Sequence, residues 1–322
     1  MAEWYRPQLA SLVDVPPAGD QWLHEIKFDG YRAGCRIADG QVTLTSRNGI
    51  DLTRTFPAIA RAARQIPARE ARIDGEIVAL LPDGRSSFHA LQHLRSSSRE
   101  PGTTAALVYM AFDLLSLDGR SLMSHPLAER KARLEALVAA QPVPAFRYST
   151  HVVGQGPAFY DQARQLALEG VVSKRADLPY RPGRSDSWRK AKCVRSQEFV
   201  VGGFTDRAGT RNGLGALLIG CYDGAALVYA GRVGTGWSAR ESEALRGRLD
   251  RLARKTCPFI PAPAGPLARS AHWVTPSLVA QVAFTEWTPD GMVRHPVYRG
   301  LRTDRSPADV QREEPGATNS ER

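Results

Sequence analysis

The sequence of 322 residues is poor in cysteine and contains no long apolar run. Its four cysteines lie far apart and form no CxxC pair, a pattern that argues against disulfides and against a cysteine-built zinc site. No segment reaches the ~18–20 consecutive apolar residues that span a bilayer, and the start, MAEWYRPQLA, lacks the apolar core of a signal peptide. We therefore expect a cytosolic protein.

Lysine is also scarce, although the chain is basic. It has 43 Lys and Arg against 33 Asp and Glu, a formal net charge of +10. Such a surplus attracts polyanions, although a base-rich genome or selection for solubility would produce it too. Arginine stays protonated and cannot act as a nucleophile, whereas a lysine amine can. The few lysines are therefore the positions to inspect for covalent chemistry: Lys27, Lys131, Lys174, Lys190, Lys192 and Lys255.

The length predicts about two domains of roughly 100–200 residues each. Up to residue 194, strand patterns alternate with helical periodicity, and from Glu198 short strands are separated by glycines, with one helix beginning at Ser238. The second pattern favours a small barrel of the OB-fold type. We expect an α+β protein with three parts: antiparallel sheets with flanking helices at 1–194, a barrel at 195–305, and a flexible tail at 306–322.

The first candidate for chemistry is the string Lys27-Phe-Asp-Gly-Tyr-Arg32. A hairpin is predicted here, because strand patterns at Trp22–Phe28 and Tyr31–Ile37 flank the turn pair Asp29-Gly30. An amine, a carboxylate and a guanidinium would then surround one tight turn and point into one pocket. Taken alone, this short string does not distinguish an active site from an ordinary turn.

Short strings along nearly the whole chain resemble, in order, the motifs of the ATP-dependent DNA ligases, a family of the covalent nucleotidyltransferase superfamily. The string that begins at Lys27 resembles the nucleophile motif. The other matching strings are Ser46-Arg47-Asn48-Gly49, Asp74-Gly75-Glu76-Ile77-Val78, Tyr109-Met-Ala-Phe112-Asp113, Glu169-Gly-Val-Val-Ser-Lys174, Trp188-Arg-Lys190-Ala-Lys192 and His295-Pro-Val-Tyr-Arg299-Gly-Leu-Arg302-Thr-Asp304-Arg305. Several matches in family order are far more specific than any single one.

Within the family, the chain is most similar to the ligase module of bacterial DNA ligase D, an end-joining enzyme. The supporting strings are Arg6-Pro-Gln-Leu-Ala-Ser-Leu, Trp22-Leu-His-Glu-Ile-Lys27, Gly202-Gly-Phe-Thr205 and Gly300-Leu-Arg-Thr-Asp304. The resemblance implies an adenylation (nucleotidyltransferase) domain at 1–194 and an OB-fold domain at 195–305. The sequence contains no polymerase or nuclease module, so we expect either a stand-alone ligase or the ligase module of a larger protein.

The resemblance implies that Lys27 attacks the α-phosphorus of ATP, forms a lysine–AMP intermediate and releases pyrophosphate. The amine must be neutral to attack, and positive charge from a metal ion, Lys190 and Lys192 would favour the neutral form. Glu25 precedes Lys27 by two residues, so the two side chains share a strand face. The resemblance implies that Glu25 accepts a hydrogen bond from the adenine amino group and helps select ATP over GTP. Asp29 would act beside Lys27 as a counter-charge.

The same resemblance assigns the other contacts. Glu76 and Glu169 are hard oxygen ligands that suit Mg²⁺ or Mn²⁺, and Phe112 would stack on adenine. Arg32 and Arg47 would hold the ribose or the 5′-phosphate of a nick. The residues that would contact the nucleotide are Glu25, Ile26, Arg32, Arg47, Glu76, Phe112, Glu169, Lys174, Lys190, Lys192 and, from the last motif, Arg302, Asp304 and Arg305, which would orient the pyrophosphate.

The implied function is the sealing of 5′-phosphate/3′-hydroxyl nicks or breaks in duplex DNA, in double-strand break repair by end joining. The resemblance also implies a Ku-type end-binding protein and a polymerase module as partners and a bacterial, nucleoid-associated location in the cytoplasm, and we expect a monomer. Two alternatives stay open. An RNA ligase or a capping guanylyltransferase of the same superfamily uses the same lysine chemistry, and a non-catalytic DNA-end-binding module would bind nicks without becoming adenylated.

Overall fold

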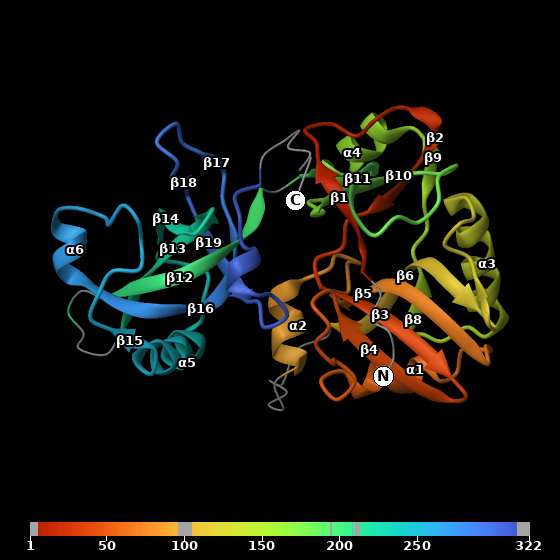
Figure 1. Cartoon of the computed structure of the whole chain (residues 1–322), viewed down its shortest axis with the longest axis horizontal. Helices are drawn as coiled ribbons and strands as arrows, with labels where there is room; N and C mark the ends of the chain where they lie inside the picture. The colour runs from red at the N-terminus through yellow and green to blue at the C-terminus, as the bar shows by residue number, and fades with distance from the viewer. Residues whose placement is uncertain (1–5, 96–104, 194, 208, 210–212, 314–322) are drawn as a thin grey trace. The chain divides into compact units, whose positions relative to one another are not determined.

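Strands dominate the structure, and Figure 1 shows them in two groups. The computed structural model describes residues 6–95, 105–193, 195–207, 209 and 213–313. Among the described residues, unit 1 comprises those up to Cys193, and unit 2 comprises those from Arg195 to Glu313. Both units contain strands and helices, so the α+β prediction is confirmed. Within the described residues, no helix has the length and apolar character needed to cross a membrane.

Unit 1 contains two sheets, whose pairs are antiparallel except β1 with β11 and β6 with β8. The first sheet has the order β1-β11-β10-β2-β9 and comprises β1 (Gln8–Leu12), β2 (Gly19–Ile26), β9 (Val152–Gly154), β10 (Gly170–Arg175) and β11 (Gly183–Lys192). The second has the order β4-β3-β5-β6-β7, with β8 beside β6, and comprises β3 (Tyr31–Ala38), β4 (Gln41–Ser46), β5 (Glu70–Leu80), β6 (Ala106–Leu117), β7 (Arg120–Ser121) and β8 (Phe146–Tyr148).

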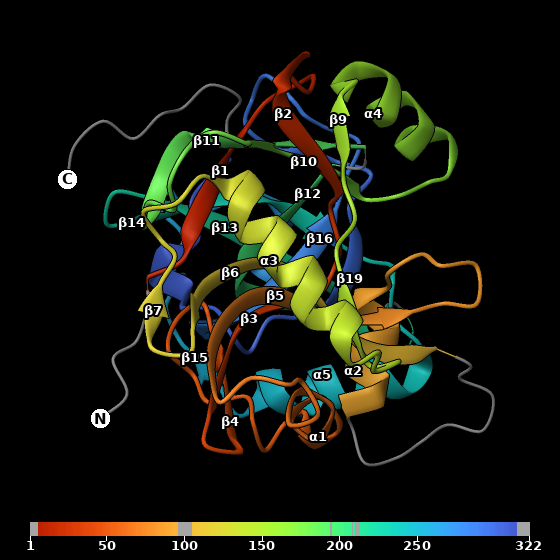
Figure 2. The same cartoon turned by 90° about the vertical axis from the view of Figure 1, so that its right-hand side faces the viewer.

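The helices of unit 1 cover these sheets. They are α1 (Pro57–Ala63), α2 (Phe88–Arg95), α3 (Leu127–Ala140) and α4 (Gly156–Gln165). Helix α3 packs against β6, as Figure 2 shows, and α4 packs against β2 and β10. The main core lies on the second sheet, where the Tyr109 hydroxyl donates to the carbonyls of Ala33 (2.7 Å) and Ile73 (3.1 Å). Gly75 makes room for that ring, because a Cβ there would lie 2.4 Å from Tyr109.

The predicted hairpin at the Asp29-Gly30 turn is wrong. β2 and β3 belong to different sheets, so the residues between them carry the chain from one sheet to the other. Beyond the end of β2, the Lys27 N–H still donates to Gly170 in β10 (2.9 Å). The crossing is tight, because a Cβ on Gly30 would lie 2.2 Å from the carbonyl oxygen of Ile77. An Asp-Gly pair suits a hairpin turn and this crossing equally well, so the local pattern does not separate them.

Two further segments of unit 1 have the composition of loops but form strands. The proline-containing start of the chain contains β1 (Gln8–Leu12). The polar segment that ends at Ser187 belongs to β11 from Gly183 onward. Both differences have one cause: the two segments pair with each other in parallel, with Gln8 opposite Gly183. Such a pairing joins residues far apart in the chain and leaves no periodic signal in either.

Unit 2 is a strongly curved sheet with the order β14-β13-β12-β16-β15, and β19 also pairs with β16. Its core lies between these strands and α5, whose N-terminus has the expected capping box of Ser238 and Glu241. The elements are β12 (Ser196–Asp206), β13 (Leu214–Asp223), β14 (Ala226–Val233), α5 (Ala239–Asp250), β15 (Ala253–Arg254), α6 (Pro266–Ser270), β16 (Ala271–Ala283), β17 (Glu286–Trp287), β18 (Val293–Arg294), β19 (Val297–Leu301) and the short 3-10 helix η1 (Pro307–Asp309).

The flexible tail expected at 306–322 does not begin at 306. Val310 is buried in the core of unit 2, and its carbonyl accepts the Tyr222 N–H at 2.8 Å. Gln197 holds the following residues, since its Nε2 donates to the Gln311 carbonyl (3.0 Å) and its Oε1 accepts the Glu313 N–H (3.0 Å). Because the segment is mostly polar, its composition does not indicate that the apolar side chain of Val310 is buried. Residues 314–322 of the expected tail lie outside the described residues.

Candidate active site

Strands β2, β10 and β11 lie side by side, and their register gathers motif residues on one face. Glu25 is opposite Val172, which is in turn opposite Lys190. Residues directly opposite each other in an antiparallel pair share a face, and so do alternate residues along one strand. This face therefore carries Glu25, Lys27, Lys174, Trp188, Lys190 and Lys192. Ile26 lies opposite Val171 on the other face, so only its backbone is available to a nucleotide on this one.

The Lys27 amine, at the end of β2, forms a hydrogen-bonded ion pair with Glu169 Oε1. Burial alone would lower the pKa of the amine, but the carboxylates of Glu169, Asp29 and Glu76 outweigh it and hold the pKa above its ordinary value. We expected positive charge around the amine to favour its neutral form. In this structure the groups that act on it are carboxylates, which favour the ammonium.

The second oxygen of Glu169 is suited to a metal ion. Among the described residues, Glu169 Oε2 is buried and has no hydrogen-bond partner. A buried ionised oxygen without a donor is costly, and a divalent cation would satisfy it. Within the described part of the chain, no group of three or more His, Cys, Asp and Glu side chains gathers at one point. Mg²⁺ commonly takes only one or two carboxylates and completes its shell with phosphate oxygens and water, so Glu169 and Glu76 fit a phosphate-bound cation.

Glu25 is at the centre of a buried network. Its side chain is only 3% exposed, and its two oxygens accept hydrogen bonds from Lys131 (2.8 Å), Lys174 (3.0 Å to each oxygen) and the Ser149 hydroxyl (3.0 Å). Burial alone would raise the pKa of the carboxyl, but the two ammonium groups lower it below its ordinary value. Glu25 is therefore an ionised acceptor whose position is set by three donors.

Phe112 and Trp188 flank the Lys174 ammonium. The Lys174 Nζ lies 4.1 Å from the ring centroid of Phe112 and 4.4 Å from that of Trp188, and the two rings meet edge to face at 5.9 Å. Burial lowers the pKa of Lys174 to about 8, although Glu25 opposes the shift. The aromatic face that we expected to stack on adenine is therefore in contact with a cation in this structure.

Arg32 links the two sheets of unit 1. It forms a bidentate pair with Asp74 (3.0 and 2.6 Å) and donates to the Gln8 carbonyl (2.6 Å), and its guanidinium lies over Phe112 and Trp188, 5.4 Å from each centroid. Asp74 also accepts from the Tyr180 hydroxyl (2.8 Å). Arg32 thus braces the aromatic pair, in an arrangement different from the ribose or phosphate contact that we expected. Arg47 follows the end of β4 and is half-buried.

The residues of the last motif belong to unit 2 and pair among themselves. Arg302 and Asp304 form a buried bidentate pair (3.0 and 2.8 Å), and Arg305 forms an ion pair with Glu198 (3.1 Å). Their positions are therefore determined within unit 2, on the segment that follows β19.

The motif comparison assigned no role to several residues that the structure places around Glu25. Lys131 on α3, Ser149 after β8 and the ring of Trp188 contact Glu25 or Lys174. The scarcity of lysine did single out Lys131, although no motif contained it. Nothing in the sequence distinguishes Ser149 from other serines.

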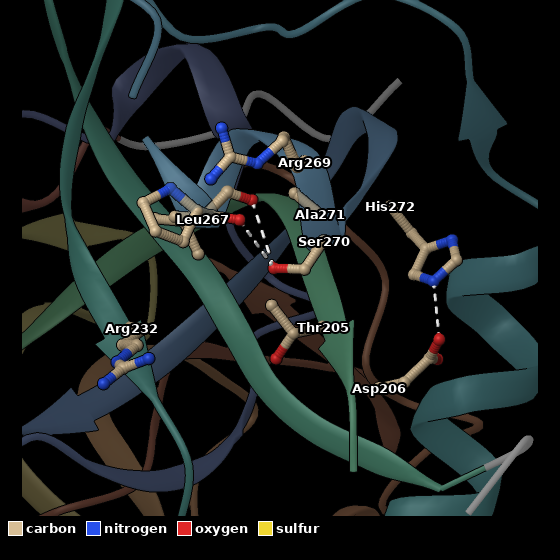
Figure 3. Close-up of a pocket in the computed structure, with 9 residues that line it drawn as sticks. Thr205, Asp206, Arg232, Leu267, Arg269, Ser270, Ala271 and His272 are labelled. Atoms are coloured by element: carbon tan, nitrogen blue, oxygen red, sulfur yellow. Dashed lines mark hydrogen bonds and ion pairs between the residues drawn. The ribbon is translucent and has the colours of Figure 1, made fainter. Parts of the chain in front are cut away.

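Unit 2 has an open pocket of about 530 Å³ that is lined by residues of β12, β14, β16 and α6. Figure 3 shows Arg232 from β14 and Arg269 from α6 beside Thr205, and the Asp206–His272 pair (2.8 Å) at the margin. Among the described residues, neither arginine side chain has a hydrogen bond or an ion pair. The pocket thus offers two exposed guanidinium groups to an anion.

Comparisons with known proteins cover both units. A family model described as "ATP dependent DNA ligase domain" matches residues 7–192, and one described as "ATP dependent DNA ligase C terminal region" matches residues 210–305. The "Multifunctional non-homologous end joining protein LigD" of Pseudomonas aeruginosa is 39% identical over 98% of this chain. The "Multifunctional non-homologous end joining DNA repair protein LigD" of Mycobacterium tuberculosis is 38% identical over 91%. The chain spans only 37% and 38% of the lengths of these relatives.

Two solved structures are similar to this chain over nearly its whole length. A "mycobacterial DNA ligase D complexed with ATP and MES" has a TM-score of 0.70 and 36% identity, over 96% of this chain and 98% of that one. The ligase domain of LigD from M. tuberculosis matches with a TM-score of 0.52 at the same identity and coverage. These matches confirm the predicted fold, a nucleotidyltransferase domain followed by an OB-fold domain. The chain belongs to the ATP-dependent DNA ligase family.

Proposed function

We propose that this chain is an ATP-dependent DNA ligase that joins 5′-phosphate and 3′-hydroxyl ends of duplex DNA through a covalent AMP on Lys27. The observation that carries the proposal is the position of the Lys27 amine. It is held by Glu169 at the end of β2, on the sheet face that also carries Lys190 and Lys192. A nucleophile beside a carboxylate and two cations suits attack on a phosphorus whose oxygens are negatively charged.

The reaction proceeds in three steps. The neutral Lys27 amine forms a bond to the α-phosphorus of ATP and releases a proton to solvent, while the bond from that phosphorus to pyrophosphate breaks. An oxygen of the DNA 5′-phosphate then forms a bond to the AMP phosphorus while the bond from that phosphorus to Lys27 breaks, and the Lys27 nitrogen takes up a proton. Finally the 3′-hydroxyl oxygen forms a bond to the DNA 5′-phosphorus, its proton passes to solvent, and AMP leaves. Lys190 and Lys192 would stabilise the charge that develops on the phosphate oxygens.

The metal would be held by Glu76 and Glu169, because Glu169 Oε2 is a buried oxygen without a donor among the described residues. Mg²⁺ or Mn²⁺ bound there would neutralise phosphate charge and offset the carboxylates that now favour the Lys27 ammonium. Asp29 would remain as a counter-charge beside Lys27, since its carboxylate already acts on the amine.

For the nucleotide, we propose that Glu25 accepts from the adenine amino group, that Phe112 stacks on the base, and that the Ile26 backbone lines the site. Lys174 would have to leave the ring of Phe112, and its lowered pKa shows that burial there disfavours its charge. Further contacts to ribose and phosphates are proposed for Arg32, Arg47, Arg302, Asp304 and Arg305.

Duplex DNA is the proposed polymer substrate, and its phosphates suit the exposed Arg232 and Arg269 of unit 2. The relatives named above are end-joining proteins, which supports a role in double-strand break repair. By the same argument we propose a Ku-type end-binding protein and a polymerase module as partners, and the bacterial nucleoid as the place of action.

Sealing of nicked DNA tests this function. The chain should join a 5′-labelled strand across a nick in a duplex, with ATP and Mg²⁺ or Mn²⁺, and should not do so without a 5′-phosphate. Glu169→Gln should lower the rate by about 10²-fold or more, as expected for loss of a charged group in phosphoryl transfer. If the folded chain seals RNA but never DNA, the proposed substrate is wrong.

A further inference from the structure

Lys131 belongs to none of the ligase motifs, yet its side chain is only 1% exposed. It lies on α3, outside both sheets of unit 1. Its amine donates to Glu25 Oε1 (2.8 Å) and to the Ser149 carbonyl (2.9 Å) and lies 4.5 Å from the centroid of the Tyr148 ring. Burying a lysine is costly, so a lysine that is both buried and fully partnered indicates a role in setting the charge or position of its partner.

The two lysines on Glu25 are held differently. Lys174 touches both carboxylate oxygens, but its other contacts are the ring faces of Phe112 and Trp188. Lys131 is held in addition by a backbone carbonyl, which cannot move away without disturbing the chain that follows β8. Lys174 is therefore the donor that an incoming ligand can displace, and Lys131 is the donor that stays.

Displacement of one donor is required by the capacity of the carboxylate. An ionised carboxylate has about four lone-pair sites, and Glu25 already accepts from Lys131, from Lys174 twice and from Ser149. A new donor must replace Lys174. Lys131 and Ser149 would then be left to fix the two oxygens, and only Lys131 would supply the charge that keeps a buried carboxylate ionised.

We propose that Lys131 is a positioning residue that keeps the Glu25 carboxylate charged and correctly oriented to accept a hydrogen bond from the 6-amino group of adenine. It thereby determines the preference for ATP over a 6-oxopurine nucleotide. The inference rests on the proposed function, because it requires a purine at the face of Phe112. Lys131 itself touches neither the nucleotide nor the reacting atoms.

The test compares the adenylation kinetics of the full chain and of Lys131→Met. Initial rates of covalent labelling are measured with α-labelled ATP and with α-labelled inosine triphosphate, which has an oxygen in place of the 6-amino group. In Lys131→Met we expect KM for ATP to rise about tenfold, the maximal rate to change less than about threefold, and the preference for ATP over inosine triphosphate to fall about tenfold. Lys255→Met, at an exposed position of unit 2, should leave all three unchanged.

A double-mutant cycle shows whether Lys131 acts through Glu25. Glu25→Gln should already have lost the preference for ATP, and adding Lys131→Met should have no further effect on KM. The double variant removes both charges of the Glu25–Lys131 pair. If Lys131→Met alone does not fold, the double variant can still be compared with Glu25→Gln.

If the wild type is labelled by ATP, either of two results overturns the inference. One is a folded Lys131→Met variant in which KM for ATP and the preference for ATP over inosine triphosphate are unchanged. The other is a Lys131→Met effect on KM that is as large in the Glu25→Gln variant as in the wild type. Absence of label on the folded wild type, in contrast, overturns the proposed function and the inference with it.

Discussion

At Glu25 three ionised side chains meet, and two of them carry the same sign. One carboxylate balances one of the ammonium groups of Lys131 and Lys174, and the aromatic rings beside each amine compensate only part of the remaining positive charge. Such an arrangement is stable only if one amine can lose its proton or leave. Lys174 can lose its proton, since burial lowers its pKa to about 8.

This shift predicts a pH dependence of stability. Below pH 8 Lys174 is protonated in the folded and the unfolded chain, so the cost of burying its charge acts in full. Between pH 8 and the ordinary value of 10.5 the unfolded chain binds more protons, and the free energy of unfolding rises with pH. Relative to Lys174→Met, which lacks this titration, the wild type should gain about 3 kcal/mol over that range. Urea unfolding at a series of pH values measures the difference, and a flat or falling curve would contradict the burial of a charged Lys174.

At the residue scale, the sequence was a better guide to the residues proposed to react than to the residues that support them. Two of the motif strings contain Lys27 and Glu169, which form an ion pair in the structure, although the pair itself was not predicted. Lys131 was not predicted as part of the site, because a lysine on an amphipathic helix is usually exposed. Its burial follows from the packing of α3 against β6, a contact between elements that no local pattern encodes.

The elements themselves were predicted better than their partners. The strands expected at Trp22–Phe28 and Tyr31–Ile37 correspond to β2 and β3, and the helix expected at Ser238 is α5. The register of β2, β10 and β11 follows from ordinary strand alternation. The wrong hairpin at Asp29-Gly30 and the unexpected β1–β11 pair were errors of pairing. Pairing depends on tertiary contacts such as Gly30 against Ile77, and these are invisible in a single string of residues.

The close approach of β10 and β11 gives a prediction for Gly170. Its carbonyl accepts the Lys27 N–H, and a Cβ on it would lie 2.2 Å from the Ala191 carbonyl oxygen. Gly170→Ala should force the strands apart, lower the stability by about 1–3 kcal/mol and slow adenylation by displacing Glu169 from Lys27. Thermal unfolding and labelling rates measure the two effects.

Gly247→Ala is the matched control, because a Cβ there meets no atom within 4 Å on helix α5. That change should raise the stability by about 0.5–1 kcal/mol. Equal changes in stability for Gly170→Ala and Gly247→Ala would contradict the prediction that a Cβ at Gly170 forces β10 and β11 apart.

At the scale of the whole molecule, the net charge of +10 agrees with a polyanionic substrate, and the two units divide the chemistry. Unit 1 contains the proposed nucleophile and the proposed base-binding residues, whereas unit 2 has its own core and an arginine-lined pocket. A ligase must act on any sequence, so its contacts should go mainly to phosphates.

Binding to nicked duplex DNA should therefore weaken steeply with salt. Each phosphate contact contributes about 0.9 to the slope of log K against log salt concentration, so replacing both Arg232 and Arg269 with alanine should reduce the slope by about 1–2. The double variant Arg36→Ala/Arg61→Ala, at exposed positions of unit 1, controls for the same change of net charge alone. Fluorescence anisotropy over a salt series gives the slopes. A salt-independent affinity would contradict phosphate binding, and an unchanged slope in the double variant would remove the pocket from the DNA interface.

The central claim, covalent catalysis by Lys27, is tested most directly by labelling. The purified chain and Lys27→Ala are first treated with pyrophosphate to remove any bound AMP, and are then incubated with α-labelled ATP and Mg²⁺ or Mn²⁺ before a denaturing gel. We predict label on the wild type and none on Lys27→Ala. A folded wild type that takes up no label, or a Lys27→Ala variant that is labelled as strongly, would contradict the assignment of the nucleophile.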